Sequence, residues 1–443
     1  MFFFVKKDKL GPTLHFFCVT LHPNLAKSME YKRLIDDRWS YREADTKEFT
    51  HCYHTYPAMM IPQIARALIS EYHPQGKLEL LLDPYMGSGT SLVEASLKGI
   101  NSIGTDLNPL ARLMAKVKTT HYDERVLTNL TNDICEQLEN YSEDKVTNTN
   151  FDRISNHTFW YTEDSLLRLS YISQMICEIV PLDLQDFFNV ALSEVVREVS
   201  FTRNGEFKRY RMSEKSLANF NPDVFVLFTR KVRRNINGLE AFNHKAPTTD
   251  VRICDFNSTN GIPSDIIPSE SVDMVVTSPP YGDSHTTVAY GQFSRWANEW
   301  FDFPHAKDLD KHLMGGKKTK EKLFITESIP EELAAIKASD EKRYYEVISF
   351  LNDYYLSICN VSKVIRRGGV VCYVVGNRNV KGIQIPLDYF TAEMFEKNGF
   401  KHDITIVREI PNKRMPSKTS PTNVAGAKVS TMSNEYIVIL KKE

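Results

Sequence analysis

Apolar side chains follow two different periods along this chain, and the changes of period mark its organisation. Residues 57–72 place apolar side chains at helical spacing, with Pro62 suited to the first turn. KLELLLDPYMGSGT then predicts a buried strand and a glycine turn, and SLVEASLKG predicts a helix that ends at Gly99. A second strand is predicted in NSIGTDLNP and a second helix in LARLMAKVKT. Strand, helix, strand and helix in this order predict a parallel sheet.

The middle of the chain keeps helical spacing, and the strand pattern returns after it. Residues 121–247 contain segments such as LQDFFNVALSEVVREVS and show no strand-like alternation. Strands are predicted again in VRICDFN, SVDMVV, GGVVCYVVGN, HDITIVREI and NEYIVIL, with a helix in IPLDYFTAEMFEKNGF. We therefore predict an α/β fold whose sheet domain, residues 51–120 and 248–443, is split by a helical insertion at 121–247. Residues 1–50 are expected to form an N-terminal extension, and the charged segment 303–345 a loop or small subdomain.

Composition places the chain among ordinary globular proteins. Of its 443 residues, 42% are apolar and 25% are charged, and the formal net charge is −1, so a surface that binds nucleic acid must be locally basic. The seven cysteines form no CxxC pair, which argues against a zinc site and fits a reducing cytoplasm. Because no run of about 18 apolar residues and no signal-peptide pattern occurs, we expect neither a membrane span nor export.

The glycine turn after the first predicted strand has the composition of a nucleotide-binding loop. Gly87 and Gly89 permit positive φ and a close approach of backbone N–H groups to a ligand, and Asp106 can accept both hydroxyls of a ribose. The third glycine of dinucleotide-binding fingerprints is missing, and Asp83 would repel a pyrophosphate but suits a cation such as a sulfonium. The pattern favours S-adenosylmethionine over NAD; the alternative is a turn that serves packing alone.

The second candidate site is TSPPY, which follows the predicted strand SVDMVV. The hydroxyl of Ser278 and the carbonyl of Pro279 can accept the hydrogens of an exocyclic base amine and localise its lone pair for attack. Pro279 and Pro280 fix φ and remove competing N–H donors, while Tyr281 offers a face on which a flipped base can stack. The alternative is a proline turn that caps the strand, with Tyr281 used for packing.

DPYMGSGT together with TSPPY resembles the amino-directed DNA methyltransferases, which methylate cytosine N4 or adenine N6. The resemblance covers 51–120 and 248–443, and it implies a Rossmann-like S-adenosylmethionine-dependent methyltransferase sheet that forms the catalytic domain. HTYPAMMIP, residues 54–62, is similar to the family segment near the methionine end of the cofactor, and Asp255 stands where the family has a residue near the adenine ring. The implied catalytic residues are Ser278, Pro279, Pro280 and Tyr281. The implied cofactor-binding residues are Tyr56, Pro57, Asp83, Tyr85, Gly87, Ser88, Gly89, Thr90, Asp106, Leu107, Asp255 and Phe256.

The serine before the two prolines indicates the target base. In this family S-P-P-Y is typical of cytosine-N4 enzymes and D-P-P-Y of adenine-N6 enzymes, so the resemblance implies N4-methylcytosine in a specific sequence of double-stranded DNA, formed without a metal. Adenine-N6 methylation is the alternative, followed by tRNA guanine-N2 methylation. Cytosine-C5 chemistry is excluded, because it needs a cysteine nucleophile that its family presents in a Pro-Cys dipeptide, and this chain has none. The resemblance also implies a restriction–modification system with a cognate restriction endonuclease.

Local positive charge marks a candidate DNA surface in the helical insertion, which is a possible target-recognition region. Residues 197–234 hold ten Lys and Arg against four Asp and Glu, and SFTRNGEFKRYR interleaves aromatic and cationic side chains. A solvated face is the alternative. Trp296 and Trp300, one helical turn apart, predict a helix core. The candidate DNA contacts are Arg203, Lys208 and Arg211 in this segment, and Asp283 and His285 after the TSPPY corner.

Overall fold

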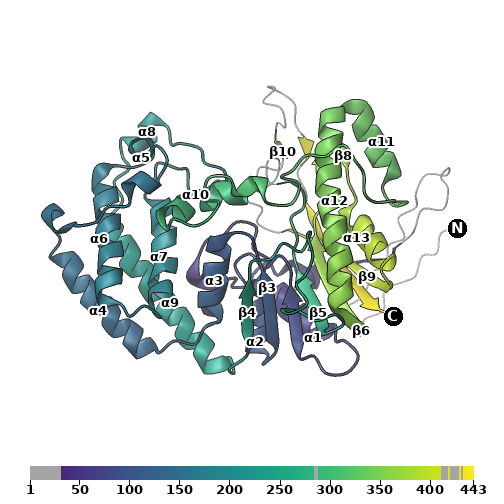
Figure 1. Ribbon diagram of the computed structural model, residues 1–443, viewed down its shortest axis with the longest axis horizontal. Helices are drawn as coiled ribbons and strands as arrows, with labels where there is room; N and C mark the ends of the chain where they lie inside the picture. Colours follow the sequence, from purple (N-terminus) through teal and green to yellow (C-terminus); the bar gives the residue numbers. More distant parts are fainter. Residues whose placement is uncertain (1–30, 284–287, 411–417, 420–428, 431–432) are drawn as a thin grey trace, which may run out of the picture.

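The computed structural model describes residues 31–283, 288–410, 418–419, 429–430 and 433–443. A mixed sheet with helices on both faces lies beside a region built mainly of helices (Figure 1). The helical region comes from the middle of the chain, so the sheet is assembled from segments that precede and follow it. Within the described ranges, no helix is both long and apolar enough to cross a membrane.

Eight strands form the main sheet, and their order defines where a ligand can bind. Across the sheet they are β1 Arg33–Ile35, β9 Phe400–Glu409, β12 Asn434–Lys442, β6 Ile365–Val375, β5 Val272–Thr277, β2 Leu80–Asp83, β3 Asn101–Thr105 and β4 Val251–Cys254. Neighbouring strands run parallel except around β12, which is antiparallel to both β6 and β9. The chain moves from β2 towards one edge and from β5 towards the other. Ligands of such sheets bind at the carboxyl ends of the strands beside this switch point.

The strands predicted from the sequence are present, and one strand of the eight-stranded sheet was missed. All six residues of β5 are buried, as expected of a central strand covered on both faces. The missed strand, β1, is three residues long and has no apolar alternation, but it pairs in parallel with β9, with Arg33 opposite Thr405. The expectation that residues 1–50 form an extension outside the sheet domain is therefore wrong for residues 33–35.

Helices bury both faces of the sheet (Figure 1). On one face, Ile64 and Leu92 belong to the same apolar core as Met274 of β5. On the other face, Ile358 and Phe390 share a core with Val275, the next residue of the same strand. The helices of the sheet domain are α1 Pro62–Glu71, α2 Thr90–Leu97, α3 Pro109–Thr119, α11 Pro330–Ser339, α12 Glu341–Val364 and α13 Leu387–Glu396.

The helical region has a core of its own, to which segments outside 121–247 also contribute. Its helices are α4 Glu124–Glu139, α5 His157–Trp160, α6 Glu163–Ile179, α7 Gln185–Glu198, α8 Glu214–Leu217, α9 Val224–Lys245 and, from later in the chain, α10 Tyr290–Trp300. Trp296 and Trp300 of α10 are 0% and 1% exposed and lie in this core, which confirms the helix-core prediction. Met114 of α3 joins the same core. The helical region therefore packs against the sheet domain through α3 and α10.

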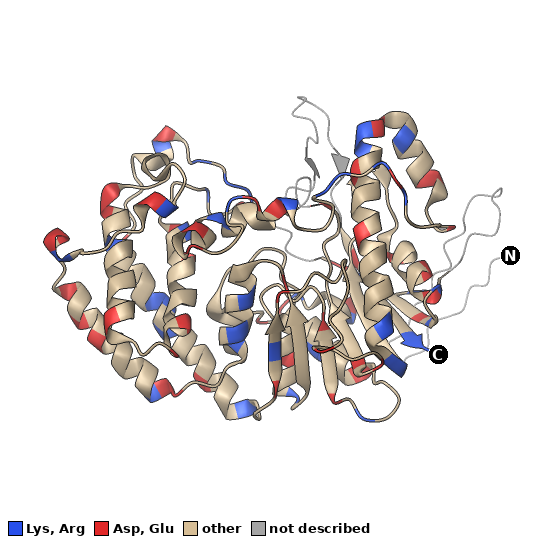
Figure 2. Ribbon diagram, in the orientation of Figure 1, with Lys and Arg blue, Asp and Glu red and all other residues tan. Residues whose placement is uncertain are grey.

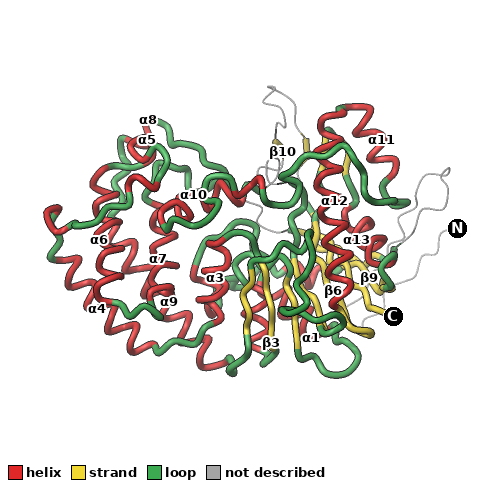
Figure 3. The backbone as a smooth tube through the Cα atoms, in the orientation of Figure 1, coloured by secondary structure: helices red, strands yellow, loops and turns green. Residues whose placement is uncertain are grey.

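Short elements and loops make up the rest of the described chain. Figure 3 shows loops running between the helical region and the sheet, on the side where α10 lies. The segment 303–345, expected to be a loop or small subdomain, consists of loops with one short 3-10 helix, α11 and the first residues of α12. The short elements are η1 Asp37–Ser40, η2 Phe49–Tyr53, η3 Glu143–Lys145, η4 Phe151–Arg153, η5 Leu309–Lys311, β7 Asn379–Val380, β8 Ile383–Gln384, β10 Lys418–Thr419 and β11 Val429–Ser430.

Candidate active site

A cavity of about 1050 Å³, part of it open to solvent, lies at the carboxyl ends of β2, β3, β4 and β5. This is the place where the strand order predicts a ligand. The predicted site residues that line the cavity are Tyr56, Pro57, Asp83, Tyr85, Gly87, Ser88, Thr90, Asp106, Leu107, Phe256, Ser278 and Pro280. The predicted residues outside the lining are Gly89, Asp255, Pro279 and Tyr281. The structure therefore brings the glycine turn and Ser278 of the TSPPY corner to one cavity.

The two glycines of the turn have different roles. Both adopt positive φ, 49° at Gly87 and 79° at Gly89, which only glycine adopts without strain. A Cβ atom on Gly87 would lie 3.5 Å from the ring of Tyr56, an ordinary contact at the cavity wall. A Cβ atom on Gly89 would lie 2.9 Å from the Cβ of Ala115, so Gly89 is needed for the close packing of α2 against α3. Gly89 does not line the cavity, and the cofactor contact predicted for it stays a prediction.

Asp106 has the geometry expected of a ribose-binding carboxylate. Its Oδ2 accepts the backbone N–H of Gly87 at 3.0 Å, and its Oδ1 accepts that of Asn108 at 2.8 Å. Each carboxylate oxygen keeps a lone pair for a ligand hydroxyl. Burial raises the pKa of Asp106 to about 6. Ser88, which also lines the cavity, has a buried hydroxyl with no hydrogen-bond partner among the described residues. These groups fit a nucleoside with free hydroxyls.

Asp83 supplies a second carboxylate to the cavity, at the end of β2. Its Oδ1 accepts the hydroxyl of Thr277 at 2.6 Å and the backbone N–H of Tyr85 at 3.1 Å. The side chain is almost fully buried, and this burial raises the pKa of Asp83 to about 6. The carboxylate is therefore ionised but poorly solvated at neutral pH, a state that a cationic ligand group stabilises. Asp83 and Asp106 together suit a ligand that has a sugar and a positive charge.

The TSPPY corner presents Ser278 and Pro280 to the cavity but directs Tyr281 elsewhere. The hydroxyl of Ser278 lies 3.2 Å from the carbonyl of Val374 and 3.2 Å from the hydroxyl of Tyr281. The Tyr281 hydroxyl donates to Glu435 of β12 at 3.1 Å, and burial, followed by the nearby Glu435 carboxylate, raises its pKa. Tyr281 is thus held against β12, and the base-stacking face expected of it is not part of the cavity wall in this structure.

Tyr290 is an aromatic residue of the cavity wall that the sequence analysis missed. It begins α10 and stacks on Tyr56, with ring centroids 5.9 Å apart and an interplanar angle of 30°. The Tyr56 hydroxyl accepts the side-chain amide of Asn108 at 2.9 Å, and the same amide donates to Ser294 of α10 at 2.7 Å. The only signal in the sequence was the position of the segment AYGQF soon after TSPPY.

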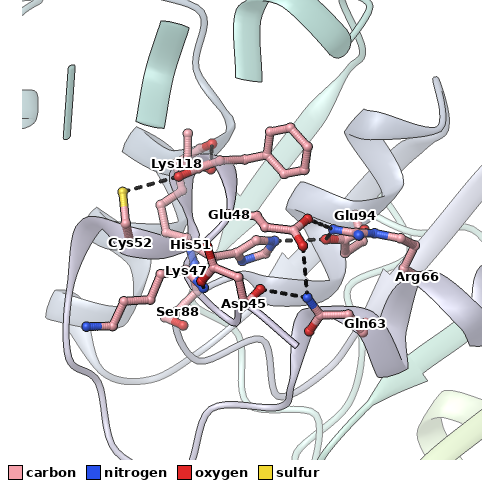
Figure 4. A network of polar contacts seen from close by, with 12 residues as sticks. Asp45, Lys47, Glu48, His51, Cys52, Gln63, Arg66, Ser88, Glu94 and Lys118 are labelled. Carbon is pink, nitrogen blue, oxygen red and sulfur yellow. Dashed lines mark hydrogen bonds and ion pairs between the residues drawn. The ribbon is translucent and has the colours of Figure 1, made fainter. Parts of the chain in front are cut away.

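A polar network, much of it buried, lies beside the glycine turn (Figure 4). Glu94 of α2 accepts the Nε2 of His51 at 2.9 Å and the Nε of Arg66 at 2.8 Å. Burial lowers the pKa of His51 to about 4, so the imidazole is neutral at physiological pH. Lys118 of α3 donates to the carbonyl of Ser88 in the turn at 2.9 Å, and burial lowers its pKa to about 8. The network ties η2, α1 and α2 together, and Lys118 fixes a carbonyl of the cofactor loop.

The residues predicted to contact DNA differ in their exposure to solvent. Arg203 is exposed and pairs with Glu206 at 3.3 Å, whereas Arg211 is half-buried, with its Nε bonded to the Phe159 carbonyl at 3.0 Å. Asp283 is buried and pairs with Arg378 at 3.3 Å, so the DNA contact predicted for it is wrong for this conformation. Lys208 is partly exposed in the same loop as Arg203. His285 lies outside the described residues.

Two further expectations concern Asp255 and metal ions. Asp255 is exposed and outside the cavity lining, while its neighbour Phe256 lines it, so a role for Asp255 near an adenine ring has no support in this structure. Within the described residues, one cluster has the donor atoms of a metal site: His305, Asp308 and His312, on the loop after α10. Asp308 lies 3.4 Å from a ring nitrogen of each histidine, and all three side chains are partly exposed.

The strand order and this cavity define a class, the Rossmann-like α/β methyltransferases that use S-adenosyl-L-methionine. Type II methyltransferase M.MvaI of Kocuria varians is 42% identical over 431 residues, which cover 90% of this chain and 93% of that protein. Type II methyltransferase M.BsoBI of Geobacillus stearothermophilus is 21% identical, covering 81% and 80% of the two chains. The chain therefore belongs to the Type II methyltransferases. It is a DNA methyltransferase, and S-adenosyl-L-methionine is its methyl donor.

Two other comparisons add little. No family model matches this chain. Among solved structures, the rRNA methyltransferase aviRa from Streptomyces viridochromogenes is similar over 88% of both chains, with 12% identity and a TM-score of 0.30. That score is too low to support an argument about substrate.

Proposed function

We propose that the protein methylates the N4 amine of cytosine in a specific sequence of double-stranded DNA. The observation that carries this proposal is that Ser278 lines the same cavity as Asp83 and Asp106. A hydrogen-bond acceptor for an amine thus shares a cavity with the two carboxylates that fit the cofactor. The neutral hydroxyl in S-P-P-Y, rather than the carboxylate of D-P-P-Y, favours cytosine over adenine through the family resemblance.

The residues of the cavity have separate tasks in this reaction. When bound, S-adenosyl-L-methionine would supply a methyl group whose bond to the positively charged sulfur breaks as its bond to the amine nitrogen forms, which leaves neutral S-adenosylhomocysteine. The methylated amine then loses one hydrogen as a proton to solvent. Asp106 orients the cofactor by accepting ribose hydroxyls, and Asp83 stabilises its positive end. Ser278 accepts a hydrogen of the target amine and thereby holds its nitrogen in line for attack. Because a duplex hides this amine, the base must leave the stack and enter the cavity, whose wall includes Pro280 and Tyr290.

Product analysis tests the proposal directly. The protein is incubated with double-stranded DNA of mixed sequence and S-adenosyl-L-methionine labelled in the methyl group, and the DNA is digested to nucleosides. We expect label in N4-methylcytosine. Label in N6-methyladenine would overturn the choice of base, and label in an added RNA rather than in DNA would overturn the class of substrate. Ser278→Ala should bind the cofactor normally but lose most of its turnover, whereas Ser269→Ala, at an exposed loop position, is the matched control.

We infer that the helical region, with α10, reads the target sequence. Figure 2 shows Lys and Arg on loops at both ends of α10, on the side where the loops of the cavity lie. One basic loop contains Arg203 and Lys208, and the other spans residues 317–322 with four lysines. Replacing Arg203 and Lys208 together with alanine should reduce the slope of log Kd against log salt by about 2. Lys77→Ala, on a loop of the sheet domain, should leave the slope unchanged, and an unchanged slope in the double variant would contradict the assignment.

A cognate restriction endonuclease is the partner that we propose. The relatives named above are Type II methyltransferases, and methylation by this protein would protect DNA against an endonuclease that cuts the same sequence. Plasmid DNA methylated to completion in vitro should resist that endonuclease and stay sensitive to enzymes with other sites. Full cleavage of completely methylated DNA by every endonuclease tested would count against a protective role.

A further inference from the structure

A hydrogen-bonded chain of side chains connects the cavity to the far strands of the sheet. Ser278 of the TSPPY corner contacts Tyr281 at 3.2 Å between hydroxyl oxygens, and Tyr281 donates to Oε1 of Glu435 at 3.1 Å. The other carboxylate oxygen of Glu435 pairs with Nη1 of Arg408 on β9. Arg408 is 2% exposed, and its Nε donates to the carbonyl of Trp39 at 2.7 Å. The chain therefore runs from the substrate side of β5 through β12 to β9.

The charges in this chain fix the direction of its protons. A guanidinium only donates hydrogen bonds, and the carboxylate that pairs with it accepts at both oxygens: Glu435 uses one oxygen for Arg408 and the other for Tyr281. The single proton of the Tyr281 hydroxyl must therefore point to Glu435, which is the direction that the geometry shows. The Tyr281 oxygen can then only accept a bond from Ser278.

The direction of the Tyr281 proton determines what Ser278 offers to the cavity. Ser278 has one hydroxyl proton and two acceptor lone pairs. Its proton is used by one of two protein oxygens, the Tyr281 hydroxyl or the Val374 carbonyl, each 3.2 Å away. Neither bond uses a lone pair of Ser278. If the Tyr281 proton pointed the other way, it would occupy one of the two Ser278 lone pairs and leave only one for the target amine.

We propose that Glu435 is a positioning residue that keeps Ser278 a hydrogen-bond acceptor for the target amine. The proposal rests on the proposed function insofar as the methylated group is an amine, whether of cytosine or adenine. Glu435 is outside the cavity lining, so it acts through Tyr281 and not on the substrate. Tyr281 then links Glu435 to Ser278, because its hydroxyl donates to Glu435 and contacts the hydroxyl of Ser278. The tyrosine of S-P-P-Y thus has a role other than base stacking.

A double-mutant cycle in the full-length protein tests this assignment. In Glu435→Gln the introduced amide turns its oxygen towards Arg408, because two facing donors repel, and its NH2 group towards Tyr281. The Tyr281 proton is then displaced onto Ser278. We expect kcat to fall about tenfold or more, while the affinity for S-adenosyl-L-methionine stays the same. Tyr281→Phe removes the hydroxyl altogether, leaves Ser278 bonded to the Val374 carbonyl, and should lower kcat less than about threefold.

The decisive variant combines both changes. Without the Tyr281 hydroxyl no proton can be turned onto Ser278, so Tyr281→Phe with Glu435→Gln should recover the kcat of Tyr281→Phe alone. If Glu435 only holds β12 against Arg408, the tenfold loss will persist in the double variant, and the proposal is overturned; an active Glu435→Gln overturns it too. The methylated nucleoside is identified in the same assay. N6-methyladenine would overturn the choice of cytosine but leave the cycle interpretable, whereas methylation at a ring carbon would overturn both.

Discussion

Asp83→Asn should change two properties in opposite directions: it should stabilise the free protein and weaken its affinity for S-adenosyl-L-methionine. Asp83 is 3% exposed, and its Oδ1 accepts bonds from both Thr277 and the Tyr85 backbone. Burial raises the pKa of this carboxyl from the ordinary 3.8 to about 6. Because both bonds meet on one oxygen, the single oxygen of an asparagine can keep them, and the substitution removes the buried charge at little cost in hydrogen bonds.

The sign and size of the effect follow from the pKa. For an acid whose folded-state pKa is raised, the folded state holds the proton more tightly, so stability falls as the pH rises from 3.8 to about 6. At 1.36 kcal/mol per pH unit, the ionised Asp83 destabilises the folded protein by about 3 kcal/mol at neutral pH. We expect Asp83→Asn to raise the free energy of unfolding by about 1–3 kcal/mol at pH 7.5, and by less than about 1 kcal/mol at pH 4.

Urea unfolding at the two pH values measures the stability, and calorimetry measures the affinity for two ligands. S-Adenosyl-L-methionine has a sulfonium and S-adenosylhomocysteine has a neutral sulfur, so the variant should bind the first about tenfold more weakly and the second nearly as well as the wild type does. A variant that is less stable than the wild type at pH 7.5 would refute the desolvation argument. An equal loss for both ligands would show that Asp83 serves the amino group, which both ligands have, instead of the sulfur.

Three further predictions concern the same cavity and its support. Affinity for S-adenosyl-L-methionine should fall about tenfold or more from pH 7.5 to pH 5, because Asp106 and Asp83, each with a pKa of about 6, become protonated and bind the ribose and the positive charge more weakly. Calorimetry on Asp106→Asn should show a smaller pH dependence, of which Asp83 is then the source. Gly89→Ala should lower the free energy of unfolding by about 2–4 kcal/mol, through strain at φ 79° and overlap with Ala115, as urea titration will measure. Gly205→Ala is its control, since no described heavy atom lies within 4 Å of the added Cβ. Burial lowers the pKa of Lys118 to about 8, so the folded state binds the ammonium proton more weakly than the unfolded state does. The free energy of unfolding of the wild type, relative to Lys118→Met, should therefore rise by about 2–3 kcal/mol from pH 8 to 10.5. A difference between the two proteins that stays constant over this range would contradict the prediction.

The sequence was sufficient for the parts of the fold in which apolar spacing decides the element. β5 is buried at every residue and α10 buries both of its tryptophans, so each leaves a clear pattern. The same analysis missed β1, since Arg33, Leu34 and Ile35 are exposed or half-buried at the sheet edge and join it through backbone pairing with β9. Edge strands held by the backbone leave little trace in side-chain pattern.

The site was predictable in its residue types but not in the directions of its side chains. Asp83, Asp106 and Ser278 line the cavity as expected, since each directly follows or ends a parallel strand at the switch point. Gly89 and Tyr281 were predicted to contact ligands, but neither lines the cavity. Gly89 lies close to Ala115, and the Tyr281 hydroxyl donates to Glu435. Glu435 lies 154 positions along the chain from Tyr281, a separation from which no spacing rule predicts contact.

Helix α10 connects the helical region, which we propose reads DNA, to the cofactor cavity. The helix begins at Tyr290 in the cavity wall and ends at Trp300 in the core of the helical region. Between these ends, Ser294 and Asn298 bond the side chain of Asn108 at 2.7 and 3.2 Å. The backbone N–H of Asn108 is also one of the two donors to Asp106. A displacement of the helical region would therefore shift Asn108, which donates to Asp106, so α10 connects the proposed target-recognition region to the residues that hold Asp106.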